Sequence, residues 1–179
     1  MIRPWPTLAS RRVGDFRIFT VRSDEKVSPR TGQPHDFYII ECVDWVNVLA
    51  VTPDDQLVMV EQFRHGSNTV ELEIPGGIMD AGETSPVDTG VRELREEGNI
   101  EMTAPPRLHG IFFNNRASRR DHVALFVVRA FRQSAAPVPN GEIIAHGFFA
   151  ADALPNDTTA ATRERIVEVL GGAPVSERW

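Results

Sequence analysis

The chain has 179 residues, 41% of them hydrophobic and 25% charged, which is enough for one compact domain or one domain with a small appendage. Its formal net charge of −6 disfavours nucleic acid as a partner, because there is no overall basic surface to bind phosphates. The single cysteine, Cys42, excludes an intramolecular disulfide and does not favour a structural zinc site.

The first six residues, Met1 to Pro6, contain two prolines and no apolar run, so the sequence predicts no signal peptide. No apolar run elsewhere approaches the roughly 18 residues that a membrane-spanning helix needs. We therefore expect a cytoplasmic protein that has no membrane partner.

The first 45 residues are predicted to form a small antiparallel β unit. Phe16 to Arg22 alternates as a half-buried strand does, and His35 to Val43 is a second run of this kind. Pro29 to Pro34 between them has the composition of a turn. Cys42 lies in the second run, where we expect a small buried residue rather than a nucleophile. Residues 1–45 and 46–179 are thus the two expected domains.

The rest of the chain alternates strands with two helices. Trp45 to Thr52 and Leu57 to Arg64 are predicted to pair as a hairpin around Pro53–Gln56. Three further strands are expected at residues 108–113, 122–131 and 142–149, and the apolar stretch 123–128 is typical of a central strand. A last helix is predicted from about Thr159 to Leu170. This order indicates the α/β class, with a sandwich built on a mixed sheet.

A helix in the middle of the chain has clear signals at both ends. Ser85 is a good N-cap and Pro86 fits the first helical position. Gly98-Asn99 supplies a residue that tolerates the left-handed conformation in which helices end. Within the helix, Val87, Val91 and Leu94 fall on one arc and are expected to face the core.

Three glutamates, Glu93, Glu96 and Glu97, fall on a different arc of this helix, with Arg92 one turn below Glu96. Like charges at this spacing repel one another, and a divalent cation such as Mg²⁺ removes that repulsion by binding the carboxylate oxygens. A solvated acidic helix face is the alternative for this string alone. The residues upstream favour the metal, because Gly76-Gly77 and Gly82-Glu83 supply a glycine-rich loop in which a phosphate can approach the backbone.

The combined pattern resembles the Nudix box, Gly-x5-Glu-x7-Arg-Glu-U-x-Glu-Glu-x-Gly-U, in which U is a bulky aliphatic residue. Gly77, Glu83 and the segment Arg92–Glu97 carry the resemblance. Eight residues separate Glu83 from Arg92 where the family has seven, so counting back from Arg92 reaches Thr84. Asn99 stands where the family has glycine, and asparagine tolerates the left-handed conformation.

The resemblance implies a Nudix-type α/β/α sandwich and a hydrolase that uses Mg²⁺ or Mn²⁺. Glu93 and Glu97 would be metal ligands, with the Gly76 carbonyl completing the set and Glu83 acting through water. Arg92 would orient the carboxylates by salt bridges. Glu96 would be a further ligand or the general base. In several Nudix subfamilies the base is instead a glutamate in a later loop, for which Glu142 is the candidate here; an exposed turn acid is the alternative reading of Glu142.

The first hundred residues resemble the branch of ADP-ribose pyrophosphatases and nucleoside diphosphate-sugar hydrolases, which has an N-terminal β unit and a strand ending like Val60-Glu61-Gln62-Phe63-Arg64. That resemblance implies substrate contact by Arg64 and a homodimer formed through the N-terminal unit. Arg119 and Arg120 suit diphosphate binding, or belong to a solvated basic loop. The expected reaction cleaves ADP-ribose or a related sugar nucleotide into a nucleoside monophosphate and a sugar phosphate. The alternatives are hydrolysis of a dinucleotide or nucleoside triphosphate, or a nucleotide sensor without catalysis.

Overall fold

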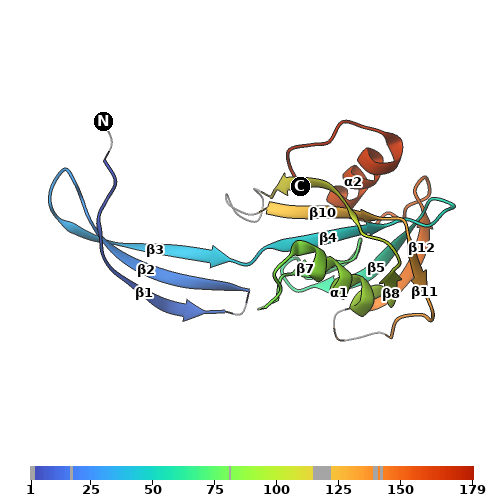
Figure 1. The fold of residues 1–179 in the computed structure, drawn as a ribbon, viewed down its shortest axis with the longest axis horizontal. Helices are drawn as coiled ribbons and strands as arrows, with labels where there is room; N and C mark the ends of the chain where they lie inside the picture. The colour runs from blue at the N-terminus through green and yellow to red at the C-terminus, as the bar shows by residue number, and fades with distance from the viewer. Residues whose placement is uncertain (1–2, 17, 81, 115–121, 139–140, 142) are drawn as a thin grey trace. The chain divides into compact units, whose positions relative to one another are not determined.

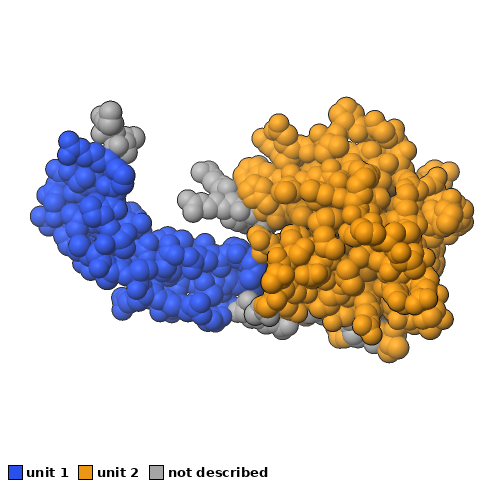
Figure 2. Space-filling model, viewed as in Figure 1, with its two compact units in different colours: residues 1–43 blue, residues 44–179 orange. Residues whose placement is uncertain are grey.

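The computed structural model describes residues 3–16, 18–80, 82–114, 122–138, 141 and 143–179. The chain divides into two compact units, residues 1–43 and residues 44–179, which are coloured separately in Figure 2. No helix in the described part of the chain is long and apolar enough to span a membrane.

The first unit is a three-stranded antiparallel sheet in the order β1-β2-β3. Its strands are β1 (Thr7–Asp15), β2 (Phe19–Val27) and β3 (Pro34–Cys42). The expected strand at residues 16–22 was placed too early, because Phe16 stacks on Phe19 at 4.8 Å and its backbone closes the turn before β2. Strand β1 was not predicted, since nearly all of its residues are exposed and give no alternation. Cys42 is exposed, contrary to the expectation that it is buried.

The described residues of the second unit form nine strands in three sheets, and β10 in the centre pairs parallel with β4 and antiparallel with β9. The predicted central strand at 123–128 is therefore confirmed, and the sheet is mixed. The sheets have the orders β7-β4-β10-β9, β12-β5-β6 and β11-β8. Their members are β4 (Trp45–Ala50), β5 (Gln56–Arg64), β6 (Thr69–Glu73), β7 (Gly76–Ile78), β8 (Ile100–Met102), β9 (Arg107–Phe113), β10 (His122–Val128), β11 (Phe131–Gln133) and β12 (Ile143–Ala150).

The predicted hairpin of β4 and β5 is correct in its turn but wrong in its pairing. The backbone amide of Thr52 donates to the carbonyl of Gln56, which closes the turn. Beyond a single bridge between Val51 and Leu57 the two strands separate, and each pairs with other partners. The apolar residues place both strands in the core but do not specify which strands are hydrogen-bonded to one another.

The two helices, α1 (Pro86–Gly98) and α2 (Ala160–Gly171), each cover a separate apolar core (Figure 1). Strand β4 shows the division, because Val46 and Val48 belong to the cluster with Leu94 of α1, whereas Leu49 belongs to the cluster with Ile166 of α2. Successive side chains of a strand point to opposite faces, so one sheet layer serves both cores. The expected α/β/α sandwich is confirmed.

The ends of α1 form as predicted. The Ser85 side chain accepts a hydrogen bond from the Val87 amide at 3.1 Å, and Asn99 takes the left-handed conformation with φ 49°. The predicted core face is only partly correct, because Leu94 is fully buried but Val91 is 41% exposed. The helix instead approaches the sheet through Gly90, where an added Cβ would lie 3.1 Å from a methyl group of Val48. An apolar arc does not reveal this close approach, because glycine adds nothing to it.

Candidate functional site

The candidate site lies where the segment from β6 to β7 runs beside the last two turns of α1. Glu93 and Glu97 are one turn apart on the helix and are only 8% and 7% exposed. Two acidic side chains on the buried face of a helix are uncommon, since charged groups are seldom buried without a partner. The burial of both carboxylates makes this face of α1 the candidate functional site.

The two glycines of β7 fit against these carboxylates. The Gly76 amide donates a hydrogen bond to Glu97 Oε2 across 3.0 Å. A Cβ on Gly77 would lie 2.2 Å from Glu93 Oε1, and one on Gly76 would lie 2.5 Å from the Val46 carbonyl oxygen. No side chain larger than hydrogen fits at either position without displacing a neighbour. The glycine pair therefore allows both carboxylates to lie against the strand.

Burial raises the pKa of both glutamates. For Glu97 the pKa rises to about 8, first because the carboxylate is removed from water and then because the Glu93 carboxylate lies nearby. The pKa of Glu93 is also raised by burial, although the charge and hydrogen bond of Arg92 oppose the shift. The pair is thus poorly stabilised as two anions by protein groups alone.

Arg92 connects the helix to the loop before it. Its Nε donates to Glu83 Oε1 at 2.8 Å, its Nη1 to Glu93 Oε1 at 2.7 Å and to Glu96 Oε2 at 3.2 Å, and its Nη2 to the Ile78 carbonyl at 2.8 Å. Three carboxylates raise the pKa of Arg92 still further above its ordinary value. The guanidinium therefore makes the contacts that were expected for orienting the acidic side chains.

Glu83 is the anchor of this arrangement. Besides Arg92, its Oε2 accepts hydrogen bonds from the Thr89 hydroxyl at 2.7 Å and from the Asp80 amide at 2.8 Å. The hydrogen bond from Arg92 contributes most to holding the pKa of Glu83 at about 2. Thus Glu83, not Thr84, meets Arg92, and the additional residue of the sequence is accommodated between them.

The structure buries two of the three helix glutamates and leaves the third outside. The Glu96 side chain is 58% exposed and makes its hydrogen bond to Arg92. A set of three carboxylates within one turn was expected, but only two share a buried face. Among the residues that the structure describes, no group of three or more His, Cys, Asp or Glu side chains is already gathered around a metal position.

Arg64 is held by Glu73, an acidic residue that was not predicted from the sequence to belong to the site. Its Nε donates to Glu73 Oε2 at 2.8 Å, and its Nη2 donates to the same oxygen. Both residues are close enough to Glu97 to affect its pKa, Arg64 lowering it and Glu73 raising it. Glu73 is the last residue of β6 and lies just before Pro75 and Gly76. This position next to the glycine pair is the sequence signal that could have indicated its role in the site.

Three predicted site residues, Arg119, Arg120 and Glu142, lie outside the described residues. His122 is the first residue of β10, and its ring lies 5.5 Å from that of Phe113. Two surface hollows adjoin α1, but neither is lined by Glu93 or Glu97. The buried glutamates therefore do not face either hollow.

Sequence relatives of this chain include enzymes and one activator. A methanol dehydrogenase activator of Bacillus methanolicus is 33% identical over 95 residues, which cover 53% of this chain and 50% of that protein. An ADP-ribose pyrophosphatase of Bacillus subtilis (strain 168) is 32% identical over 91 residues, covering 51% of this chain and 48% of that protein. The chain spans about half the length of the curated relatives it matches.

Solved structures share the fold. The crystal structure of an ADP compounds hydrolase superposes with a TM-score of 0.65 at 19% identity, covering 96% of this chain and 97% of that one. An ADP-ribose pyrophosphatase of Streptococcus suis gives a TM-score of 0.53 at 24% identity, covering 76% of this chain and 95% of that one. A family model described as NUDIX domain matches residues 43–170, which is most of the chain. The chain therefore belongs to the NUDIX domain family.

Proposed function

We propose that this protein is a metal-dependent pyrophosphohydrolase that cleaves ADP-ribose or a related nucleoside diphosphate sugar. The products would be a nucleoside monophosphate and a sugar phosphate. In this reaction the oxygen of water bonds to one phosphorus, the anhydride P–O bond breaks, and the proton of the water passes to a general base. The ADP-ribose pyrophosphatases among the relatives, about half of whose length this chain matches, support the substrate class.

The observation that carries the proposal is the buried pair Glu93 and Glu97 against Gly76-Gly77. A structural role would be served as well by apolar residues, since burying two carboxylates beside each other costs free energy. Their elevated pKa values express that cost. A divalent cation offsets it, because hard cations prefer carboxylate oxygens. The donor set therefore fits Mg²⁺ or Mn²⁺.

In the proposed site, Glu93 and Glu97 would hold the cation together with the Gly76 carbonyl. Glu83 would reach it only through water, because both of its oxygens already accept hydrogen bonds. The chemistry that a bound divalent cation supplies is charge neutralisation and polarisation of the diphosphate oxygens. Arg92 keeps Glu93 oriented by the contact between Nη1 and Oε1.

For the general base, the candidates are Glu96 and Glu142. Glu96 is exposed and shares Arg92 with Glu93, so its carboxylate is accessible to a water molecule. Arg64, Arg119 and Arg120 are the proposed substrate-binding residues. Arg64 is suited to this task because Glu73 fixes its guanidinium in one orientation beside Glu97.

The proposal is tested with a substrate panel. The protein of residues 1–179 is incubated with ADP-ribose, other nucleoside diphosphate sugars, dinucleotides, nucleoside triphosphates and capped RNA, each with Mg²⁺ and with Mn²⁺. Products are identified by ³¹P NMR. We expect ADP-ribose or another sugar nucleotide to be cleaved fastest, at the anhydride. Absence of hydrolysis with either metal would leave the non-catalytic nucleotide sensor as the function.

We further propose that the protein acts as a homodimer joined through residues 1–45. Apolar side chains are exposed on the described strands of this unit, including Leu8 at 60%, Tyr38 at 70% and Ile40 at 62%. Neither of the two buried apolar clusters includes a residue of this sheet. A three-stranded sheet without a core of its own gains stability from a partner that covers it.

A further inference from the structure

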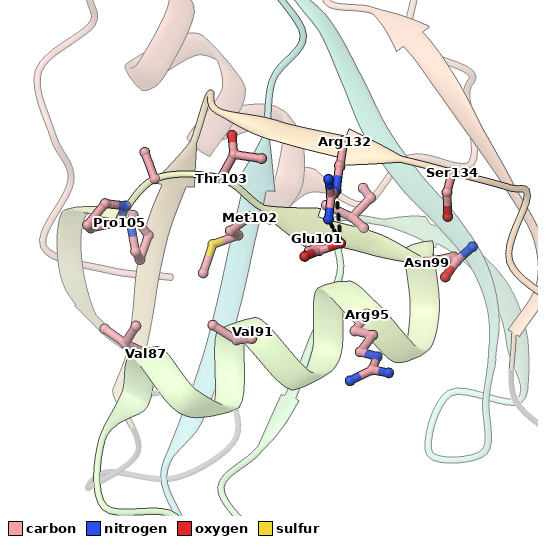
Figure 3. A pocket seen from close by; sticks show the side chains of 13 residues that line it. Val87, Val91, Arg95, Asn99, Glu101, Met102, Thr103, Pro105, Arg132 and Ser134 are labelled. Atoms are coloured by element: carbon pink, nitrogen blue, oxygen red, sulfur yellow. Dashed lines mark hydrogen bonds and ion pairs between the residues drawn. The ribbon is translucent and has the colours of Figure 1, made fainter.

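A groove of about 780 Å³ lies between α1 and the two-stranded ribbon formed by β8 and β11 (Figure 3). We call it the rear groove. Ligand pockets in proteins range from about 300 to 1,000 Å³, so its size suits a small organic molecule. It is lined along α1 by Val87, Val91, Arg95 and Asn99, and along the opposite wall by residues 100–106, Arg132 and Ser134.

The rear groove is separate from the proposed catalytic site. Val91 and Arg95 are spaced four residues apart and share one face of α1. Glu93 follows Val91 by two residues, or about 200° around the helix, so it points to the opposite side. A ligand in the rear groove would therefore touch the catalytic helix without touching the buried carboxylates.

One end of the rear groove is apolar. Figure 3 shows Val87 and Val91 pointing from α1 toward the wall that holds Met102 and Pro105. Val87 and Met102 also pack against the core beneath α1, which gives this end a fixed floor. Val91 is 41% exposed although its helical position suits burial. An apolar body placed here would remove that surface from water.

The other end carries an unbalanced positive charge. Arg132 is neutralised by Glu101, whose Oε2 accepts hydrogen bonds from Nε at 2.9 Å and from Nη2 at 2.7 Å. Arg95, also a lining residue, forms no side-chain hydrogen bond or ion pair with the other described residues. A free guanidinium beside an apolar floor is complementary to a ligand with an apolar body and one anionic group.

We propose that the rear groove binds a small organic anion, with its apolar body on Val87, Val91 and Met102 and its carboxylate or phosphate group on Arg95. The site does not depend on the proposed hydrolase activity. It is defined by a cavity, an apolar floor and, at one end, Arg95, which has no ion-pair partner among the described residues.

The test uses 8-anilinonaphthalene-1-sulfonate, which joins apolar rings to one anionic group. Amide NMR spectra of the ¹⁵N-labelled protein of residues 1–179 are recorded during titration with this probe. We expect the saturable shifts to centre on Val91, Arg95 and Met102. Arg95→Gln and Val91→Glu should each weaken binding by at least about tenfold, because each removes one half of the recognition.

Matched control variants distinguish binding at this site from non-specific binding of the probe. Arg11→Gln changes an exposed arginine of β1, and Val167→Glu changes an exposed valine of α2; both should bind the probe as the unaltered protein does. Shifts centred on strands β1 to β3, or equal affinity in all variants, would overturn the proposal.

Two competitors define the anionic group. We expect 1-naphthyl phosphate and 1-naphthoate to displace the probe, and whichever binds more tightly identifies the preferred group. Inorganic phosphate should displace it poorly, because it lacks the apolar body. Equal displacement by inorganic phosphate, or failure of both naphthyl compounds, would contradict the proposed ligand class.

Discussion

The amide of Gly76 donates a hydrogen bond to the Glu97 carboxylate across 3.0 Å and thereby ties strand β7 to the last turn of α1. This bond favours the charged form of Glu97, but burial opposes it more strongly, and the pKa stays near 8. The carboxylate is therefore fixed in position while its charge is left for another group to stabilise. The proposed cation site rests on this combination.

Replacing Gly77 by alanine should abolish most of the activity. The added Cβ would lie 2.2 Å from Glu93 Oε1, so the carboxylate must move. Displacement of a catalytic group by about 1 Å can cost on the order of 100-fold in rate, and we expect a loss of kcat of that size. Gly66→Ala is the control, since its Cβ would meet nothing within 4 Å. Equal activity of the two variants would show that the Glu93 position is irrelevant.

Arg92→Lys should lower activity although the positive charge is retained. A lysine cannot reproduce the separate contacts of Nε, Nη1 and Nη2 to Glu83, Glu93 and the Ile78 carbonyl. We expect a fall in kcat of about 100-fold and a higher Mg²⁺ concentration for half-maximal rate. Arg107→Lys, at an exposed position of β9, should leave both quantities unchanged. A similar effect of both substitutions would argue against the orienting role.

The metal-free protein should become less stable as the pH rises from about 4.5 to 8. Glu97 keeps its proton in the folded state up to about pH 8, whereas the unfolded chain releases it near 4.5. The folded state thus binds more protons in this window, so the free energy of unfolding falls, by on the order of 1 kcal/mol per pH unit. Above about pH 8 this contribution is lost completely.

Urea denaturation at pH 5, 6.5 and 8.5 measures this dependence. Glu97→Gln should flatten the profile relative to the unaltered protein, whereas Glu101→Gln, which changes an exposed acid, should not. Mg²⁺ should stabilise the unaltered protein more at pH 8.5 than at pH 5, because it binds the ionised carboxylates. A Glu97→Gln profile parallel to the unaltered one would show that burial of Glu97 has no energetic consequence.

Asn99 should tolerate glycine better than alanine. Its φ of 49° and ψ of 38° are left-handed, a conformation that costs alanine about 1–2 kcal/mol, and its side chain donates to the Ala135 carbonyl at 2.9 Å. Asn99→Ala loses both advantages, while Asn99→Gly loses only the hydrogen bond. Equilibrium unfolding should rank the stabilities Asn, Gly, Ala. A more stable alanine variant would refute the assignment of Asn99 as the helix cap.

Ile40→Asp should weaken the proposed dimer. The side chains of Tyr38 and Ile40 lie on one face of β3 and are both exposed, so a charge placed there must be desolvated when a second copy covers the face. Analytical ultracentrifugation should show a dimer for the unaltered chain and a monomer for the variant. Val167→Asp, at an exposed position of α2, is the control. A chain that is monomeric before substitution contradicts this proposal directly.

The layered architecture and the ends of α1 could be predicted because they depend on local rules. Ser85, Pro86 and Asn99 act within a few residues of one another, and the apolar run 123–128 is typical of a central strand. The pairing of β4 and β5 could not be predicted, since both strands satisfy the same burial pattern whichever neighbours they have. Strand β1 was missed because an exposed strand carries no alternation.

The candidate site could be predicted only in part, because some of its features depend on packing between segments that are distant in the sequence. The resemblance selected Glu93, Glu97 and Arg92, and the structure brings these three together with Gly76 and Gly77. Glu96 lies about 100° around the helix from Glu97, and packing against the sheet decides which arc of α1 is buried. Glu73 was missed because its role depends on the neighbouring strand that carries Arg64.

The most direct measurement of the central claim is the rate of ADP-ribose hydrolysis with saturating Mg²⁺, followed by ³¹P NMR, for the unaltered protein and for Glu97→Gln. The substitution keeps the size of the side chain but removes its charge. We predict AMP and ribose 5-phosphate from the unaltered protein, and a rate at least about 100-fold lower from the variant, with its fold intact by circular dichroism. A folded variant that turns over at a rate close to that of the unaltered protein would contradict the account.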